Sequence, residues 1–87
     1  MIFEWDDAKA TANEAKHGVS FRYAASIFLD PDRVDLDTSR PEDREDRRKV
    51  IGVIDGRLFT VVYTLRGRAM RLISARRAND QETRHHG

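Results

Sequence analysis

The pattern of apolar and polar residues from Arg47 to Ala78 predicts three antiparallel β-strands joined by two tight turns. The segment is rich in Val, Ile, Thr, Phe and Tyr, which are the residues that strands favour. Asp55-Gly56 is the stronger turn signal, because a type I′ turn needs positive φ at both of its central residues. If this turn has two residues, Ile54 pairs with Arg57.

The second turn and the alternation of side chains determine which residues share a face. Arg66-Gly67 is the weaker turn signal, and a two-residue loop there pairs Leu65 with Arg68. Directly opposed residues share a face, and successive residues alternate between faces. One predicted face is apolar enough to form the core: Val50, Phe59, Val61, Tyr63, Met70 and Leu72. The other face carries cations and hydroxyls interleaved with Ile51, Val62 and Ile73: Arg47, Lys49, Thr60, Thr64 and Arg71.

The N-terminal part of the chain predicts a short strand and two helices that cover the apolar face. Residues 2–5 alternate as a strand does, and Asp6 is a suitable N-cap for a helix that ends at His17-Gly18. Small residues recur at helical spacing and would allow this helix to approach the sheet: Ala8, Ala12 and Ala15. A second helix begins after Ser20 and ends at Asp30-Pro31. Its apolar stripe contains Phe21, Ala24, Ala25 and Phe28.

The remaining segments complete an α+β fold. Residues 33–37 alternate as an edge strand, residues 38–46 form a polar loop, and Asn79 or Asp80 caps a short helix near the C-terminus. We therefore expect an antiparallel sheet with two N-terminal helices packed on one face and a short C-terminal helix. At 87 residues the chain forms one small domain, residues 1–87.

The composition and the first residues of the chain indicate where in the cell the protein is located. The chain has no cysteine, so neither a disulfide nor a thiolate metal site is available to it. The first residues lack the basic and apolar regions of a signal peptide, and no segment is long and apolar enough to cross a membrane. These features predict a cytoplasmic protein that makes no contact with a membrane.

The net charge of +1 conceals a strong asymmetry between the two halves of the chain. Residues 1–46 carry a net charge of −6 and residues 47–87 a net charge of +7. Nine of the ten basic residues in the second half are arginines, whose planar guanidinium group suits phosphate recognition. The predicted strands thus present a candidate anion-binding face, although the acidic half neutralises part of it on folding.

Three stretches of the chain carry a family resemblance: FEWDDAKATANEAKHGVSF, EDRRKVIG and VVYTLRGRAMRLISARRA. Together they resemble the BrnT toxins of type II toxin–antitoxin systems, and KHGVSF and ISARRA are the most specific parts. The resemblance implies a RelE-like fold and a ribonuclease toxin that inhibits translation. It also implies an antitoxin partner, BrnA, with a ribbon-helix-helix segment, so that the complex would bind operator DNA through the antitoxin.

Cleavage of RNA without a metal or other cofactor requires cations that stabilise charge at the phosphate and a group that takes the 2′-proton. Arg47, Lys49 and Arg71 on the basic face are the candidate catalytic cations. Glu45, or Lys49 with a lowered pKa, is the candidate proton acceptor. Tyr63 lies on the predicted core face, where a buried structural tyrosine is the commoner role.

Further residues near the basic face are candidates for binding RNA. Arg76 and Arg77 follow the third strand and could grip flanking phosphates, and the hydroxyl groups of Thr60 and Thr64 lie on the same predicted face. The basic face could also dock an acidic stretch of the antitoxin, which is compatible with cleavage of RNA. Two alternatives to the ribonuclease remain open: a non-catalytic module that binds nucleic acid or protein, and a solvated sheet face that merely carries arginines. Cleavage of RNA by the purified protein distinguishes the ribonuclease from both.

Overall fold

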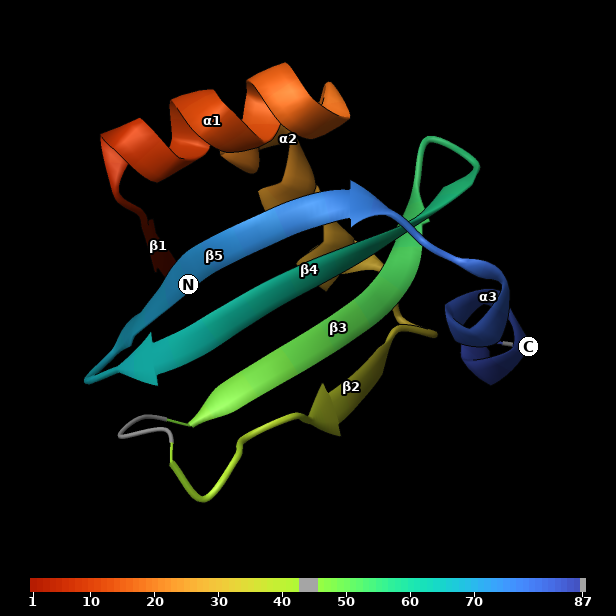
Figure 1. Ribbon diagram of the computed structural model, residues 1–87. Coiled ribbons are helices and arrows are strands. Elements are labelled where there is room, and N and C mark those ends of the chain that lie inside the picture. Colours follow the sequence, from red (N-terminus) through yellow and green to blue (C-terminus); the bar gives the residue numbers. More distant parts are fainter. Residues whose placement is uncertain (43–45, 87) are drawn as a thin grey trace.

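A five-stranded sheet carries the rest of the fold in the computed structural model (Figure 1). The structure describes residues 1–42 and 46–86. In chain order the elements are β1 (Ile2–Glu4), α1 (Asp7–His17), α2 (Phe21–Ala24), the 3-10 helix η1 (Ala25–Leu29), β2 (Val34–Asp37), β3 (Arg47–Ile54), β4 (Arg57–Arg66), β5 (Ala69–Arg77) and α3 (Asp80–His86). None of the described helices has the length and apolar character needed to cross a membrane.

The strands lie in the spatial order β1-β5-β4-β3-β2, and one pairing differs from the antiparallel sheet expected from the sequence. Strands β2 to β5 pair antiparallel, whereas β1 pairs with β5 in parallel, so the sheet is mixed. Phe3 of β1 lies opposite Met70 of β5, and both pack against the hydrophobic core. A long-range pairing of this kind leaves no local signal in a three-residue strand.

The hairpin between β3 and β4 confirms the predicted turn. Asp55 has a φ of 51° and Gly56 a φ of 78°, as a type I′ turn requires. Ile54 pairs with Arg57, and the register continues without interruption to the opposite end of β3. The sequence therefore predicted this half of the sheet residue by residue.

The hairpin between β4 and β5 has a different register from the one expected. Arg66 pairs with Ala69, so the loop is Gly67-Arg68, and Leu65 pairs with Met70 rather than with Arg68. Gly67 has a φ of 57° at the first central position, where a type II′ turn needs glycine. The shift of two positions keeps the side chains from Ala69 to Leu72 on their predicted faces, because faces alternate with a period of two.

A β-bulge in the same pair changes the faces further along β5. Tyr63 pairs with Leu72 but Val62 pairs with Ser74, so β5 holds one additional residue at this point. Beyond the bulge, Ala75 is fully buried in the core, and Arg76 lies opposite Thr60 on the other face. The bulge thus places Arg76 on the same side of the sheet as the basic residues of β3.

The predicted apolar face of the sheet is confirmed as the core. Val50, Phe59, Val61, Tyr63 and Leu72 are buried, and Met70 packs against them. The residues that α2, η1 and the preceding turn contribute to this cluster are Val19, Phe21, Ala24, Ile27 and Phe28. Figure 1 shows α2 behind the sheet, on this inner face.

Helix α1 has the predicted ends but not the predicted contact face. Asp6 caps its N-terminus by accepting a hydrogen bond from the backbone of Lys9, and Gly18 takes the left-handed conformation at its C-terminus. The stripe of Ala8, Ala12 and Ala15 is exposed, so its predicted contact with the sheet is wrong. Asn13 is buried instead.

Asn13 joins α1 to the sheet through three hydrogen bonds. Its amide nitrogen donates to the carbonyl oxygens of Val19 (3.1 Å) and Ala75 (2.8 Å), and its amide oxygen accepts from the backbone nitrogen of Ala75 (3.1 Å). A polar side chain can face the core here because every one of these groups is paired.

Helix α3 lies on the opposite, outer face of the sheet and contacts β3 (Figure 1). Asn79 is its N-cap, since the side-chain oxygen accepts a hydrogen bond from the backbone of Glu82 at 2.8 Å. At the other end of α3, His86 lies 3.1 Å from the carboxylate of Asp30. Ile51 and Thr60, opposite one another on this face, are fully buried.

Candidate nucleic-acid interface

The outer face of the sheet carries a row of polar residues across four strands, which we call the Arg71 row: Glu4, Arg71, Thr64 and Arg47. Thr64 pairs with Arg47 on one side and with Arg71 on the other. If Leu65 paired with Arg68 as expected, Arg71 would lie opposite Val62. The actual register places Arg71 opposite Thr64 and brings the two arginines into the same row. Because neighbouring strands are about 4.8 Å apart, the two backbones are about 10 Å apart, which two arginine side chains can span around one phosphate.

Thr64 lies at the centre of this row and is fully buried. Its hydroxyl oxygen has no hydrogen-bond partner among the described residues. Arg47 and Arg71, on either side of it, are each partly exposed. Thr64 lies on the predicted face of the sheet, although its hydroxyl is buried there, and its role in RNA binding stays a prediction.

A hollow of about 340 Å³ adjoins the row, and three of its lining residues are cations: Arg40, Arg47 and Lys49. Arg40 was not among the residues that the sequence singled out. It follows Ser39, whose hydroxyl accepts a hydrogen bond from the backbone nitrogen of Arg47 at 2.8 Å. This bond ties the polar loop to the start of β3 and places Arg40 beside the outer face.

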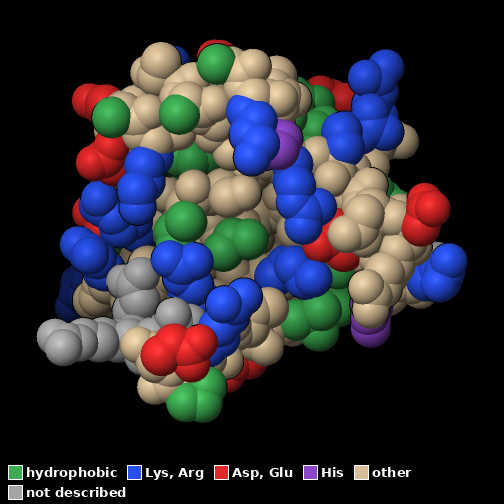
Figure 2. Space-filling view, in the orientation of Figure 1, with side chains coloured by type: hydrophobic (Ala, Val, Ile, Leu, Met, Phe, Trp, Pro, Cys, Tyr) green, Lys and Arg blue, Asp and Glu red, His purple; other side chains and the backbone are tan. Residues whose placement is uncertain are grey.

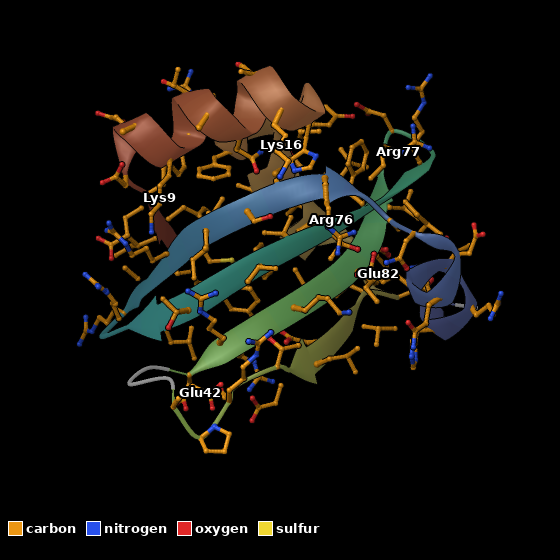
Figure 3. The ribbon with its side chains drawn as sticks, in the orientation of Figure 1. Lys9, Lys16, Glu42, Arg76, Arg77 and Glu82 are labelled. Atoms are coloured by element: carbon orange, nitrogen blue, oxygen red, sulfur yellow. The ribbon has the colours of Figure 1, made fainter. Side chains whose placement is uncertain are left out.

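Among the carboxylates that the structure describes on the outer face, Glu82 of α3 has the most hydrogen-bond and ion-pair partners. It is only 1% exposed, and it accepts hydrogen bonds from both terminal nitrogens of Arg76 at 2.7 and 2.8 Å. It also accepts from the Thr60 hydroxyl at 2.9 Å and from the backbone of Asn79 at 2.9 Å, and it lies 3.1 Å from Nζ of Lys49. Figure 3 shows Arg76 and Glu82 pointing toward one another.

These contacts decide the protonation state of Glu82. Burial alone raises the pKa of its carboxyl group, because a charged group loses solvation in the interior. Hydrogen bonds from Arg76, Asn79, Thr60 and Lys49 outweigh burial and hold the pKa well below its usual range. Glu82 is therefore an anion at neutral pH, and it offsets part of the positive charge of the outer face.

The remaining residues that the sequence proposed for RNA binding have different surroundings in the structure. Arg76 and Thr60 share the Glu82 carboxylate, and Thr60 is fully buried on the predicted face of the sheet. Arg77 is exposed and lies over the Phe59 ring, 5.5 Å from its centroid. The RNA-binding roles of Arg76, Arg77 and Thr60 stay predictions. Glu45, the proposed proton acceptor, lies outside the described residues.

Tyr63 belongs to a separate network on the inner face. Its hydroxyl donates a hydrogen bond to Asp35, which also forms an ion pair of 3.1 Å with Arg48. Burial and the bond to Asp35 raise the pKa of Tyr63 to about 12, although Arg48 opposes the rise. The phenol is therefore neutral at physiological pH and serves as a structural hydrogen-bond donor.

Cations nevertheless dominate the outer face. Figure 2 shows Lys and Arg side chains distributed across the side of the sheet on which α3 lies. Within residues 1–42 and 46–86, no group of three or more His, Asp or Glu side chains is arranged to hold a metal ion. The surface is thus suited to an anionic partner, and its chemistry at neutral pH rests on guanidinium and ammonium groups.

Comparison with known proteins identifies the family. No curated protein matches the sequence significantly. The family model described as "Ribonuclease toxin, BrnT, of type II toxin-antitoxin system" matches residues 5–82, which is nearly the whole chain. The match begins directly after β1, includes β2 to β5 completely and ends at Glu82 within α3. The chain therefore belongs to the BrnT family of ribonuclease toxins of type II toxin–antitoxin systems.

Proposed function

We propose that this toxin cleaves RNA without a metal ion, with the scissile phosphate bound at the Arg71 row and the adjoining hollow. The observation that carries the proposal is the placement of Arg47 and Arg71 on either side of Thr64, with Lys49 lining the hollow that Arg47 also lines. Preorganised cations of this kind stabilise the charge that develops at phosphorus during attack by the 2′-oxygen.

The contacts of Lys49 suggest how the roles are divided. Its ammonium group lies 3.1 Å from the buried carboxylate of Glu82, so the side chain is held in place as a cation beside the hollow. We therefore assign Lys49 to charge stabilisation and Glu45 to removal of the 2′-proton. Arg76 is the proposed contact for a flanking phosphate on this face. Arg77 lies opposite Phe59 on the other face of the sheet, so its contact with a flanking phosphate would need RNA that passes around the end of β5.

Family membership implies an antitoxin partner, and we propose its nature and its consequences. A BrnA-like antitoxin with a ribbon-helix-helix segment would neutralise the toxin and carry the complex to operator DNA. The free toxin would cleave RNA in the cytoplasm and inhibit translation, using a RelE-like arrangement of sheet and helices. An antitoxin that binds tightly enough to neutralise the toxin should bury more than about 1,200 Å² of accessible surface in total.

One observation favours a second function, that of a non-catalytic module that binds nucleic acid or protein. Glu82 already pairs with Lys49 and Arg76, as it would if these cations had only a structural role. Such a module would bind RNA through the rest of the basic face and leave it intact.

The decisive experiment is incubation of the purified toxin with RNA in the presence of EDTA. The proposal predicts cleavage with a 2′,3′-cyclic phosphate or 3′-phosphate product, because the 2′-oxygen is the nucleophile. An RNA with a 2′-deoxy nucleotide at the cleaved position is the matched control, and it should stay intact. Cleavage that needs added Mg²⁺ would contradict the metal-free mechanism, and binding without cleavage would favour the module.

A cellular experiment tests the biological class. Expression of the toxin alone should arrest growth, and co-expression of the antitoxin encoded beside it should restore growth. The two proteins should also purify together. Growth arrest that the antitoxin does not relieve would contradict the proposed neutralisation.

A further inference from the structure

Two hollows meet at Arg22 on the helix-bearing side of the sheet, and together we call them the Arg22 groove. The first, of about 290 Å³, is lined by residues that include Phe3, Phe28 and Leu29. The second, of about 180 Å³, is lined by residues that include Trp5 and Phe21. Arg22 lines both, so the groove runs along α2 and η1 beside the N-terminal strand.

Aromatic pairs line both parts of the groove. The rings of Phe3 and Phe28 lie 5.4 Å apart, and those of Trp5 and Phe21 lie 6.0 Å apart in an edge-to-face arrangement. Phe21 and Phe28 belong to the core, so their positions are held by the packing beneath them. The aromatic part of the lining is therefore held in place before binding, which lowers the entropy lost on association.

The first hollow also has a strongly exposed apolar border. Leu29 is 84% exposed and Met1 is 79% exposed, and both line it. Single exposed apolar side chains are common on protein surfaces, but two of them beside an apolar hollow are typical of a docking site. Covering these side chains would remove apolar surface from water and stabilise a complex.

The charge at the centre of the groove indicates the chemistry of the occupant. Arg22 is exposed and forms no ion pair with any residue that the structure describes. A carboxylate that reached Arg22 between two apolar contacts would complete the site. RNA fits poorly, because a single cation beside Glu14 offers little attraction to a chain of phosphates.

We propose that the Arg22 groove binds an amphipathic segment of the antitoxin, with apolar side chains against the aromatic lining and one carboxylate on Arg22. This inference rests on the family membership of the chain and not on the proposed cleavage mechanism. The groove lies on the opposite side of the sheet from the Arg71 row. Anchoring of the antitoxin and obstruction of the RNA site are therefore separate functions, carried out by different parts of the antitoxin.

The chain offers both a direct probe and a matched control for this proposal. Trp5 is the only tryptophan, so toxin containing 5-fluorotryptophan gives one ¹⁹F signal, from within the groove. Leu29→Glu and Arg22→Glu are the test variants. Leu65→Glu and Arg66→Glu place the same changes on exposed residues near the β4–β5 turn.

Titration with purified antitoxin should shift the ¹⁹F signal of wild-type toxin. Affinity should fall at least tenfold in each groove variant and stay within twofold of wild type in each control variant. Thermal melts check folding, and the milder changes Leu29→Ser and Arg22→Gln replace any variant that fails to fold. Equal affinity in groove and control variants, or full binding with an unshifted signal, would overturn the proposal.

A second copy of the toxin is the competing occupant. A ¹⁹F shift that depends on toxin concentration in the absence of antitoxin, and that is lost in the groove variants, would assign the groove to self-association and would also overturn the proposal. RNA cleavage is not part of this experiment. The proposal for the groove can therefore be contradicted while the proposed ribonuclease mechanism holds, and the reverse is equally possible.

Discussion

Arg76 and Glu82 form a bidentate ion pair that fastens the C-terminal helix to the outer face of the sheet. Both terminal nitrogens of the Arg76 guanidinium group donate to the carboxylate, at 2.7 and 2.8 Å, and Nζ of Lys49 lies 3.1 Å from it. Glu82 therefore does two things: it holds α3 in place and it fixes two cations of the candidate site. The first of these functions can be tested without any substrate.

Replacing Glu82 with glutamine should destabilise the protein. The amide keeps the shape of the side chain but leaves Arg76 and Lys49 without their anion. Loss of one member of a buried pair is costly, and since both cations are partly exposed we expect roughly 2–4 kcal/mol. Denaturant unfolding at pH 7 measures the change in the free energy of unfolding. Glu14→Gln, an exposed change on α1, should have almost no effect.

The same variant has a defined pH dependence. The pKa of Glu82 lies below its ordinary value of 4.5 in the folded protein, so its stabilising contribution is complete above that value. The contribution is lost as pH falls through the folded pKa. The stability difference between wild type and Glu82→Gln should thus be constant above about pH 5.5 and should shrink in more acidic solution. A difference that stayed constant in acid would show that the ionised carboxylate is not its source.

Arg47→Ala and Arg71→Ala should each reduce RNA cleavage at least about tenfold while leaving the fold intact, because neither residue belongs to the core. Lysine should restore little activity, since a bidentate grip on phosphate needs the guanidinium group. Single-turnover cleavage with saturating RNA measures the effect. Arg57→Ala, at the β3–β4 turn, is the matched control and should retain activity.

Salt dependence separates positioned cations from general attraction. Affinity for RNA falls linearly with the logarithm of salt concentration, with a slope set by the number of phosphate contacts. A variant that lacks only a nonspecific contact should show a shallower slope and normal turnover with saturating RNA. Equal losses of turnover in the Arg57, Arg47 and Arg71 variants would mean that diffuse charge explains cleavage and that the proposed site is wrong.

Leu72→Ala should cost roughly 2–5 kcal/mol of unfolding free energy, as is usual for truncation of a buried leucine. Leu72 is 1% exposed and lies in the central core cluster, opposite Tyr63. Denaturant unfolding monitored by far-UV circular dichroism provides the measurement. A loss below about 1 kcal/mol would be inconsistent with full burial.

Asn13→Ala tests the contact between α1 and β5. The change removes three hydrogen bonds and leaves both backbone groups of Ala75 unpaired in a buried setting. We expect a loss of roughly 2–4 kcal/mol, because each buried unpaired group costs about 1–3 kcal/mol. Lys16→Ala, on the exposed surface of the same helix, should change stability very little. Comparable losses in the two variants would argue against a specific role for the Asn13 amide.

Local chemistry was sufficient for several parts of this fold to be predicted. Asp55-Gly56 has a strong preference for the type I′ turn, so the register of β3 on β4 follows from two residues. Alternation of apolar residues then identified the core face of the sheet. The N-caps Asp6 and Ser20 and the left-handed Gly18 likewise act within one helical turn, and all three are confirmed.

Other features depend on contacts between residues that are distant in the chain. The parallel pairing of β1 with β5 and the burial of Asn13 each require a partner more than fifty residues away in the chain. The bulge beside Tyr63 is a choice between local registers of similar energy. A one-residue bulge has no sequence signal of its own in a strand rich in arginine and apolar residues. The bulge nevertheless determines on which face of the sheet Arg76 lies.

The candidate site likewise combines features that the sequence predicted with features that only the structure showed. The sequence by itself determined that Arg47, Lys49 and Arg71 share one face of a sheet, because strand alternation is a local property. Only the tertiary structure brought Arg40 to the hollow and set Glu82 against Lys49 and Arg76. The bond between Ser39 and Arg47 places Arg40, the bulge determines the face on which Arg76 lies, and β4 and β5 separate Lys49 from Glu82 in the chain. The Asn79-to-Glu82 spacing is that of a capping box, so it predicts a helix start but not which cations the glutamate will meet.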